Sequence, residues 1–483
     1  MHNHVSLSLQ SNRALFSPYL DALQNPRFSP KTRFQTRPVF KCCGIQTHVP
    51  PQLCRNSINY ANGSLEGDRG IISVGVKDFD VATLGNLCVD IVLNVPKLPP
   101  KRFDERRAYL EELAKSPPDK NNWEAGGNCN MAIAAARLGL RVASIGHVGD
   151  EVYGRFLLDV LHGEGISMVE MNEQNYAIDA SSTTPETLLC WVLVDPWHRH
   201  DFCSPVDFHQ EPAFGWIQIL PTKTKMAIRR SKIMFCNGYG FDELSPQLLV
   251  SALEYAVEVG TSIFFDPGPR GKSLIAGAPE EQMALDKYLR MSDVLLLTSD
   301  EAESLTGRTD PILAGQELLR NGVRTKWVII KMGPRGSILI TPSSISCAPA
   351  FKVNVIDTVG CGDSFVAPIA FGYIHDMSLV QTLTVANAVG AATATGCGAG
   401  RNVAALNKVL ELVTGSDLYE DDKFWVDLLK EHSETDEITI LTKNPPGIGN
   451  KNNTWLQHTP LKEVVSELLP KLGCQQALQI GAS

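Results

Sequence analysis

The chain has 483 residues, of which 43% are hydrophobic and 20% charged, and its formal net charge at pH 7 is −9. It is longer than an average single domain, and its composition is that of a soluble globular protein with a large core. The acidic balance argues against direct nucleic-acid binding by the folded body. No apolar run approaches the roughly 18–20 residues that span a bilayer, so no membrane segment is expected.

Residues 1–65 differ from the rest of the chain in charge. Over about the first 60 of them, seven Lys and Arg residues accompany a single acid, Asp21. A basic, acid-poor, Ser-containing composition is typical of an organelle transit peptide. The segment lacks the apolar core of a secretory signal and an evident Arg-rich amphipathic helix, which favours a plastid, and hence the chloroplast stroma, over a mitochondrion. A disordered basic tail is the alternative.

From about Phe79 onward, strand-like and helix-like segments alternate. Strands are predicted at 81–85, 90–95, 141–146, 188–194, 233–236, 262–265, 294–297, 327–331 and 353–356, and helices at 130–139, 153–162, 248–259 and 314–320. This alternation predicts a three-layer α/β/α domain over 79–413, with a mostly parallel central sheet. The early strands near 86–96 cannot all join that sheet, and we expect them to form a small second one.

Two further segments interrupt or follow this pattern. Residues 101–123 form a charged insertion, predicted to be helical and broken by Pro117 and Pro118. Residues 414–483 form an acidic C-terminal extension, loop-like from Lys443 to Pro460, whose last amphipathic stretch is suited to dock on the body or on a partner. The twelve cysteines include no CxxC pair, which favours a reducing compartment over a disulfide or zinc framework.

The most informative segment is Val355–Phe365. It reads as a strand, a glycine-rich turn and a helix start, and the free N–H groups at a helix start favour bound anionic oxygen. Gly360 and Gly362 let the main chain approach a phosphate. Asp363 adds a carboxylate that can take a proton from an attacking hydroxyl. These are the requirements for moving a phosphoryl group onto an alcohol; a structural turn with Asp363 as a helix cap is the alternative.

Carboxylates also follow other predicted strands. Asp266 follows 262–265, Glu301 follows 294–297, and Asp363 follows 353–356. Ligands of parallel sheets bind at the carboxyl ends of the strands, so this agreement predicts an active-site cleft there. Any one of the three alone is also explained as a helix cap.

Several motifs together resemble the ribokinase or pfkB family of carbohydrate kinases, over roughly Val81 to Lys408. The family's signature Asp-Thr-x-Gly-Ala-Gly-Asp is met by Asp357 to Asp363, with Cys361 in place of Ala. The matching segments, in chain order, are Gly85–Asp90, Gly126–Gly139, Gly146–Gly154, Ala302–Gly307, Lys331–Gly336 and Asp357–Asp363.

The resemblance implies a role for each matching position. Asp363 would be the catalytic base, with the amides of Gly360, Cys361 and Gly362 as the anion hole. The implied sugar-binding residues are Asp90, Gly126, Gly127 and Asn130; the implied nucleotide-binding residues are Thr358, Gly333, Gly336 and Asn387; and Glu301 would organise Mg²⁺ through water and phosphate. The small early sheet would be a lid that closes over the sugar and excludes water.

The sequence departs from the family pattern at a few positions. Thr298 replaces the Asn of the magnesium motif, Cys88 stands where ribokinases carry a sugar-binding Asn, and Pro368 is expected to kink the helix after Asp363. Cysteine at a helix N-terminus tends to have a lowered pKa, so redox sensing is an alternative role for Cys361.

Two hypotheses of different classes follow. The first is an ATP- and Mg²⁺-dependent kinase in the plastid acting on a hydroxyl of a sugar-like small molecule, by default a ketose or pentose, with adenosine-type nucleosides as an alternative. The second is a fructokinase-like scaffold or regulator in a plastid protein complex such as the gene-expression machinery. The insertion, the acidic extension, Thr298 and Cys361 motivate the second. The oligomeric state is left open.

Overall fold

The computed structural model describes residues 77–171, 186–415, 417–419, 421–432, 437–443 and 456–482. They belong to one compact unit that begins at Val74. The predicted transit segment 1–65 lies outside the described residues. Within the described part of the chain, no helix has the length and apolar character needed to cross a membrane.

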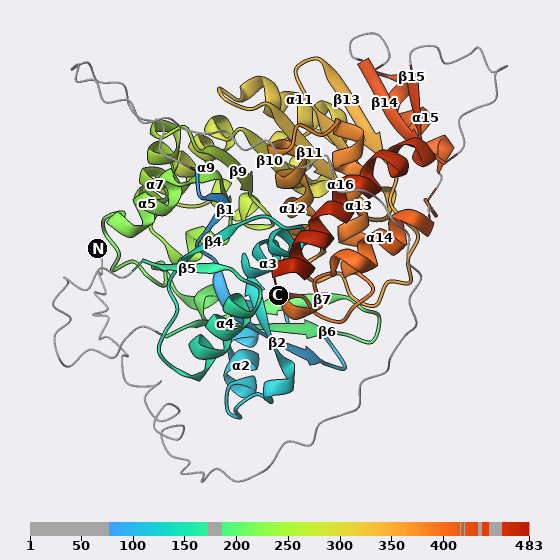
Figure 1. Ribbon diagram of the computed structural model, residues 1–483. Helices are drawn as coiled ribbons and strands as arrows, with labels where there is room; N and C mark the ends of the chain where they lie inside the picture. Colours follow the sequence, from blue (N-terminus) through green and yellow to red (C-terminus); the bar gives the residue numbers. More distant parts are fainter. Residues whose placement is uncertain are drawn as a thin grey trace, which may run out of the picture. The chain divides into compact units, whose positions relative to one another are not determined.

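Eleven strands form the main sheet (Figure 1), in the order β15-β14-β13-β12-β11-β10-β9-β8-β1-β4-β5. All neighbouring pairs are parallel except the two that involve β12. The strands are β1 (Phe79–Leu84), β4 (Val142–Gly146), β5 (Ser167–Glu170), β8 (Ser231–Asn237), β9 (Ser262–Asp266), β10 (Val294–Thr298), β11 (Trp327–Lys331), β12 (Ser337–Ile340), β13 (Ser344–Ala348), β14 (Glu437–Thr442) and β15 (Leu456–Pro460). The predicted mostly parallel sheet is confirmed.

A second sheet of four strands has the order β3-β2-β6-β7 and lies next to α2 and α4 in Figure 1. Its strands are β2 (Leu87–Asn94), β3 (Trp123–Gly127), β6 (Leu188–Val194) and β7 (His200–Cys203). The predicted small sheet is therefore confirmed, and we call it the lid sheet. Its strands β3 and β7 were not predicted, and β3 begins at the last residue of the proposed insertion, whose helix α2 spans Phe103–Leu113.

Helices cover both faces of the main sheet because its strands are apolar on both sides. In β10, for example, Val294 and Leu296 pack into one core cluster, while Leu295 and Leu297 pack into the other. The first face carries α3 (Cys129–Arg137), α4 (Val152–Gly163), α12 (Cys361–Ile374), α13 (Leu379–Thr393), α14 (Leu406–Gly415) and α16 (Leu461–Ala482). The second carries α5 (Thr222–Arg229), α7 (Pro246–Glu258), α8 (Arg270–Ile275), α9 (Pro279–Met291), α10 (Ser299–Thr306), α11 (Pro311–Asn321) and α15 (Asp422–Lys430).

Two predictions of local structure are wrong. Residues 353–356 form no strand, and Val355 and Ile356 are exposed there, so their β-branched side chains do not pack in a sheet. Leu456–Pro460, expected to be a loop, is strand β15, which pairs with β14 in parallel. The C-terminal extension thus adds two strands to the main sheet, and α16 buries Leu461, Leu468 and other residues against the first face.

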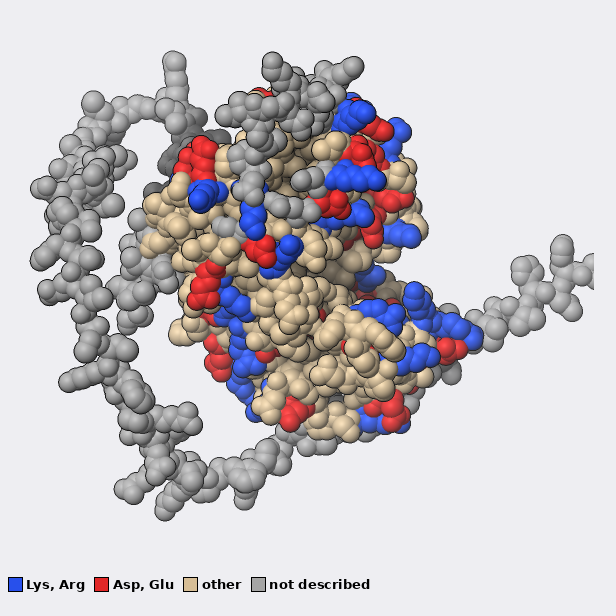
Figure 2. Space-filling model, turned by 90° about the vertical axis from the view of Figure 1, so that its right-hand side faces the viewer, with Lys and Arg blue, Asp and Glu red and all other residues tan. Residues whose placement is uncertain are grey.

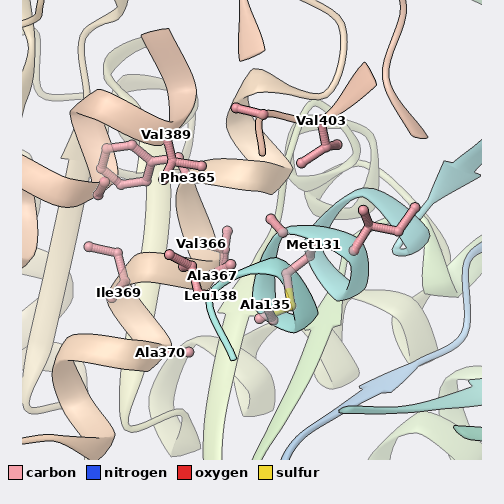
Figure 3. Close-up of a cluster of buried hydrophobic side chains, with 14 of the residues drawn as sticks. Met131, Ala135, Leu138, Phe365, Val366, Ala367, Ile369, Ala370, Val389 and Val403 are labelled. Carbon is pink, nitrogen blue, oxygen red and sulfur yellow. The ribbon is translucent and has the colours of Figure 1, made fainter. Parts of the chain in front are cut away.

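Helices α3 and α12 pack closely and carry four of the predicted site residues: Asn130 on α3, and Cys361, Gly362 and Asp363 on α12. Figure 3 shows Met131 and Ala135 of α3, and Leu138 just after its end, facing Val366 and Ala367 of α12. Small side chains at this contact let the two helices approach. As a result, the N-terminus of α3 meets the N-terminus of α12.

Candidate active site

The turn before α12 is held by the side chain of Asp357, which is almost completely buried. Its Oδ1 accepts a hydrogen bond from the Val359 N–H at 3.0 Å, and its Oδ2 accepts one from the Gly398 N–H at 2.7 Å. Gly360 caps the helix with φ of +71°, and a Cβ there would lie 2.4 Å from the Ala399 Cβ. The turn therefore requires glycine at 360, because of both the positive φ and the lack of space for a Cβ.

Gly362 has a different reason to be glycine. A Cβ on this residue would meet only the Lys331 Nζ, at 3.7 Å, so packing permits a larger side chain. The missing side chain instead leaves open space next to an ammonium group and the start of α12. The N–H groups of Gly360 and Gly362 have no backbone partner within the described part of the chain, whereas the Cys361 N–H donates to the Thr358 carbonyl at 3.3 Å. Open space, free N–H groups and a cation suit a phosphate.

Asp363 lies at the third position of α12 and contacts α3. Its Oδ2 accepts a hydrogen bond from the Asn130 Nδ2 at 3.2 Å, and the Asn130 Oδ1 accepts one from the Gly400 N–H at 2.7 Å. The structure thus brings together Asp363 and Asn130, which are 233 positions apart in sequence. Burial, with a further contribution from the Asp266 carboxylate, raises the pKa of Asp363 to about 6, and Asn130 and Lys331 oppose the rise. A carboxylate with this pKa is ionised at pH 7 and basic enough to accept a proton.

A second charged group lies at the ends of β9, β10 and β11. The Lys331 Nζ donates to the Asp266 Oδ2 at 2.6 Å, and both side chains are mostly buried. Glu301 is close enough that burial and the Asp266 charge raise its pKa, while Lys331 lowers it. Lys331 is the first residue of a segment that resembles the family, but it was not predicted to be a site residue. A lysine that ends an apolar strand gives no distinctive signal in sequence.

Between the main sheet and the lid sheet there is a cavity of about 130 Å³, which we call the acceptor cavity. Of the predicted sugar-binding residues, Asp90, Gly127 and Asn130 line it, as does Asp363. Gly126 does not line it but lies directly behind: a Cβ at 126 would be 2.1 Å from the Asp90 Oδ1. The remaining described lining residues are Asn86, Cys88, Leu188, Cys190, Phe202, Ser204, Val206, Asp207, Asn237, Tyr239, Asp242, Glu243, Val359 and Gly360.

Among the described residues, five carboxyl side chains line this cavity, those of Asp90, Asp207, Asp242, Glu243 and Asp363. Burial raises the pKa of Asp90 to about 7; the Cys88 thiol, which donates to its Oδ1 at 3.5 Å, opposes the rise, and the Asp363 charge adds to it. Burial also raises the pKa of Glu243 to about 8. The Glu243 Oε2 accepts from the Asn86 N–H at 2.6 Å, but its Oε1 and the Asn237 Oδ1 are buried without a hydrogen-bond partner among the residues that the structure describes. Sequence reasoning missed both residues, since nothing marks them as polar groups that face a cavity.

On the other side of the α12 turn lies a larger pocket of about 480 Å³, which we call the nucleotide pocket. All four predicted nucleotide-binding residues line it, together with Lys331, Cys361 and Gly362. The other lining residues are Thr298, Pro334, Ala350, Phe351, Val353, Val355, Phe365, Gly390, Ala391, Ala394 and Tyr419. Most of these residues are apolar. Val355 is exposed because it lines this pocket and does not belong to a strand.

Asn387 and Gly336 shape the pocket wall. The Asn387 side chain accepts from the Ser337 hydroxyl at 2.9 Å and donates to the Ala348 carbonyl at 2.8 Å, so its polar atoms hold β12 and β13 in place. Gly336 has φ of +103°, and a Cβ there would be 2.1 Å from the Ala348 oxygen.

Cys361 does not fit the alternative role in redox sensing. Burial raises the pKa of its thiol to about 12, with the nearby carboxylates of Asp357 and Asp363 adding to the rise. The thiol therefore stays protonated at neutral pH, and only a thiolate reacts readily with oxidants. The helix N-terminus does not offset burial here.

The carboxylates of the site fit a magnesium ion held partly by phosphate. The described residues contain no cluster of three or more His, Cys, Asp or Glu side chains that could hold a metal alone. Mg²⁺ usually binds through one or two carboxylates, water and substrate phosphates. Glu301 is suitable, since within the described ranges only its Oε2 is engaged, as the acceptor from the Thr298 N–H at 2.7 Å. The Thr298 hydroxyl caps the same turn, accepting from the Glu301 N–H at 3.2 Å.

Two adjoining pockets, one lined by several carboxyl side chains and the other mostly by apolar residues and glycine, with a carboxylate and free backbone N–H groups between them, suit a small-molecule phosphotransferase of the ribokinase-like α/β class. Residues 79–191 and 227–405 match the pfkB family of carbohydrate kinases. The chain belongs to this family, and the fold and the kinase class expected from the sequence are confirmed.

Relatives and solved structures agree with this assignment. Fructokinase-1 of Zea mays is 25% identical over 69% of this chain and 97% of its own, and a 5-dehydro-2-deoxygluconokinase of Bacillus thuringiensis is 26% identical over 66% and 90%. An E. coli protein provisionally assigned as ribokinase II, with ATP and Mg²⁺ bound, has a TM-score of 0.56 at 18% identity and covers 70% of this chain and 99% of its own. An adenosine kinase of Sinorhizobium meliloti has a TM-score of 0.53 at 20% identity over 66% and 95%. At such identities the structures support the fold.

Proposed function

We propose that the protein transfers the γ-phosphoryl group of ATP, with Mg²⁺, to a hydroxyl group of a neutral sugar. The observation that carries the proposal is the position of Asp363, which lines the acceptor cavity while the adjacent Gly362 lines the nucleotide pocket. The base and an anion-binding N–H group therefore lie on consecutive residues at the border of the two pockets. Phosphoryl transfer requires this proximity of the attacking hydroxyl and the phosphate.

Each group in the site has a defined task in this reaction. Asp363 accepts the proton of the attacking hydroxyl, and Asn130 fixes the orientation of its carboxylate. The free N–H groups of Gly360 and Gly362, with the Lys331 ammonium, stabilise charge on the transferred phosphoryl group. Mg²⁺, when bound at Glu301, would supply further charge neutralisation on the nucleotide phosphates.

The lid sheet separates the acceptor from solvent. Strands β2, β6 and β7 contribute Asp90, Cys190 and Phe202 to the cavity wall. His200 of β7 also reaches the turn, with its Nδ1 3.4 Å from the Thr358 Oγ1. A lid in this position favours transfer to the sugar over transfer to water.

Turnover across a sugar panel tests the proposal. ATP consumption is measured with fructose, ribose, other ketoses and pentoses, and adenosine, and the phosphorylated product is identified by mass. We expect a ketose or a pentose to be phosphorylated, with less than a few per cent of the ATP hydrolysed without transfer. Binding of ATP without transfer to any acceptor would contradict the proposal.

We also propose that the protein acts in the plastid stroma. The support is the composition of residues 1–65, which carry basic and Ser residues and almost no acids. A fluorescent protein fused after residue 76 should enter chloroplasts, and replacement of the seven Lys and Arg residues by Gln should abolish import. Retention of the unmodified fusion in the cytosol would contradict this location.

A second candidate function is a scaffold or regulator in a plastid protein complex. It is favoured by exposed aromatic and aliphatic side chains in residues 192–226, which lie outside the family match: Trp197 is 69% exposed, Ile219 66% and Trp216 38%. Such side chains are common at protein interfaces. An affinity pull-down from plastid extract that recovers a stable complex with the wild type, but not with the Trp197→Ser/Ile219→Ser double variant, would support it. Recovery of the same complex with both would contradict a role of this surface, and recovery of no stable complex with the wild type would contradict the scaffold function.

A further inference from the structure

The nucleotide pocket includes one residue from outside the family match. The match ends at residue 405, and Tyr419 of the C-terminal extension lines the pocket together with Val353, Val355 and Ala394. The Tyr419 side chain is 50% exposed, so its ring is not needed to fill the core. An exposed ring among apolar pocket walls offers a stacking surface.

Main-chain contacts fix the position of this ring. The Tyr419 N–H donates to the Ala350 carbonyl at 2.8 Å, and the Lys352 N–H donates to the Asp417 carbonyl at 2.8 Å. Between them, Leu418 pairs with Phe351 in an antiparallel bridge and is almost completely buried. Because the anchoring groups are backbone atoms and the Leu418 side chain, the ring is held in place without contributing to the anchor.

The extension also reaches the loop that carries the predicted nucleotide glycines. The Arg335 guanidinium, between Gly333 and Gly336, lies 4.5 Å from the centroid of the Phe424 ring of α15. The Lys352 ammonium lies 5.7 Å from the Tyr419 centroid. Cations at these distances are attracted to an aromatic ring. Besides Tyr419 itself, the extension therefore contacts the 333–336 loop, whose glycines line the pocket.

We propose that Tyr419 is a base-binding residue, and that the C-terminal extension completes the nucleotide pocket by stacking this ring on the purine base of ATP. The inference rests on the proposed function, since it takes this pocket as the nucleotide site. The pocket has the size and composition that a planar base requires: its volume is about 480 Å³, most of its walls are apolar, and Gly362 and Lys331, which suit a phosphate, belong to the same lining.

Nucleotide binding by the full-length chain tests the proposal, measured by calorimetry with ADP and with inorganic tripolyphosphate, which has no base. Tyr419→Ala should weaken ADP binding by about 5- to 100-fold, the range for removing one stacking partner of a base. Tyr419→Phe should bind ADP within about twofold of the wild type, since the ring is retained. Both variants should bind tripolyphosphate like the wild type. Met283→Ala, an exposed residue of α9 on the other face of the main sheet, is the control for ADP binding.

The outcomes distinguish a failure of this inference from a failure of the proposed function on which it rests. If the wild type binds ADP and Tyr419→Ala binds it equally well, the stacking role is wrong while the kinase proposal stands. Equal losses of ADP and tripolyphosphate binding would show that the ring supports the pocket's structure, and would also overturn the proposal. No ADP binding by the wild type would overturn both the inference and the proposed function.

Discussion

The acceptor cavity and the nucleotide pocket share the α12 turn but differ in the chemical groups that line them. Carboxyl side chains of Asp90, Glu243 and Asp363 face the acceptor cavity, and burial raises the pKa of each. The nucleotide pocket is mostly apolar, and its polar features come largely from glycine backbone and from Lys331. A sugar presents hydroxyl donors in several directions, which side chains match individually, whereas a phosphate can be bound by repeated N–H groups.

The difference predicts how each region responds to mutation. On the acceptor side, changing one functional group should remove activity and leave the fold intact. On the nucleotide side, many side chains should be replaceable, while the glycines and the buried ion pair should not. On the face in view in Figure 2, outside its grey atoms, Lys and Arg are interspersed with Asp and Glu, so we expect single charge changes on that face to have little effect on activity.

The largest effect is expected at Asp363. Asp363→Asn keeps the size of the side chain but removes the proton acceptor, so kcat should fall by about 10²- to 10⁴-fold. Since burial raises the pKa of Asp363 to about 6, activity of the wild type should rise as pH increases through about 6 and then level off. Steady-state kinetics from pH 5 to 8 checks both points. Asp300→Asn, an exposed neighbour of the site, is the control, and undiminished turnover of Asp363→Asn would exclude Asp363 as the base.

The buried ion pair on the nucleotide side should follow. Lys331→Met leaves Asp266 buried without its partner, and losing one member of such a pair costs about 3–5 kcal/mol of unfolding free energy. The double variant Lys331→Met/Asp266→Leu should recover most of that stability without recovering activity. Urea denaturation with ATPase assays distinguishes these cases. An active double variant would show that Lys331 has no part in phosphate binding.

The sequence predicted the turn and most of the strands for identifiable reasons. Gly360 and Asp363 fall within a motif whose spacing is dictated by backbone geometry, and strands such as Val294–Thr298 are continuous apolar runs. It failed at Val353–Ile356, where β-branched side chains line a pocket and do not form a strand. It also missed Leu456–Pro460, since only Leu456 is buried in that strand.

Site residues that depend on long-range packing could not be predicted in the same way. Glu243 and Asn237 line the acceptor cavity together with Asp90, Cys190 and Phe202 of the lid sheet, which lie far from them in the sequence. Lys331 gains its role from Asp266, which lies 65 positions earlier. Tyr419 reaches the nucleotide pocket only through a bridge between Phe351 and Leu418. No pattern within a short window of sequence contains such information.

A smaller and separable effect is expected at the two glycines of the turn. Gly360→Ala should lower the unfolding free energy by about 1–2 kcal/mol or more, because its positive φ disfavours a Cβ and Ala399 occupies the space. Gly362→Ala should leave stability within about 0.5 kcal/mol but weaken ATP use, because its methyl group would enter the space beside Lys331. Thermal unfolding and the KM for ATP check the pair. If Gly362→Ala were destabilising and fully active, its glycine would be structural.

The smallest effect is expected at Cys361, the one residue of the turn that departs from the family signature. Cys361→Ala restores the family residue and removes a thiol that contacts the Asp357 carbonyl oxygen at 3.9 Å. Because burial raises the thiol pKa to about 12, no thiolate charge is lost at neutral pH. Turnover should stay within about twofold, and unfolding free energy within about 1 kcal/mol. The wild type and Cys361→Ala should have the same activity as each other both before and after treatment with hydrogen peroxide. A large loss in Cys361→Ala would mean that this turn depends on its side chains as the acceptor cavity does, and the contrast between the two regions would fail.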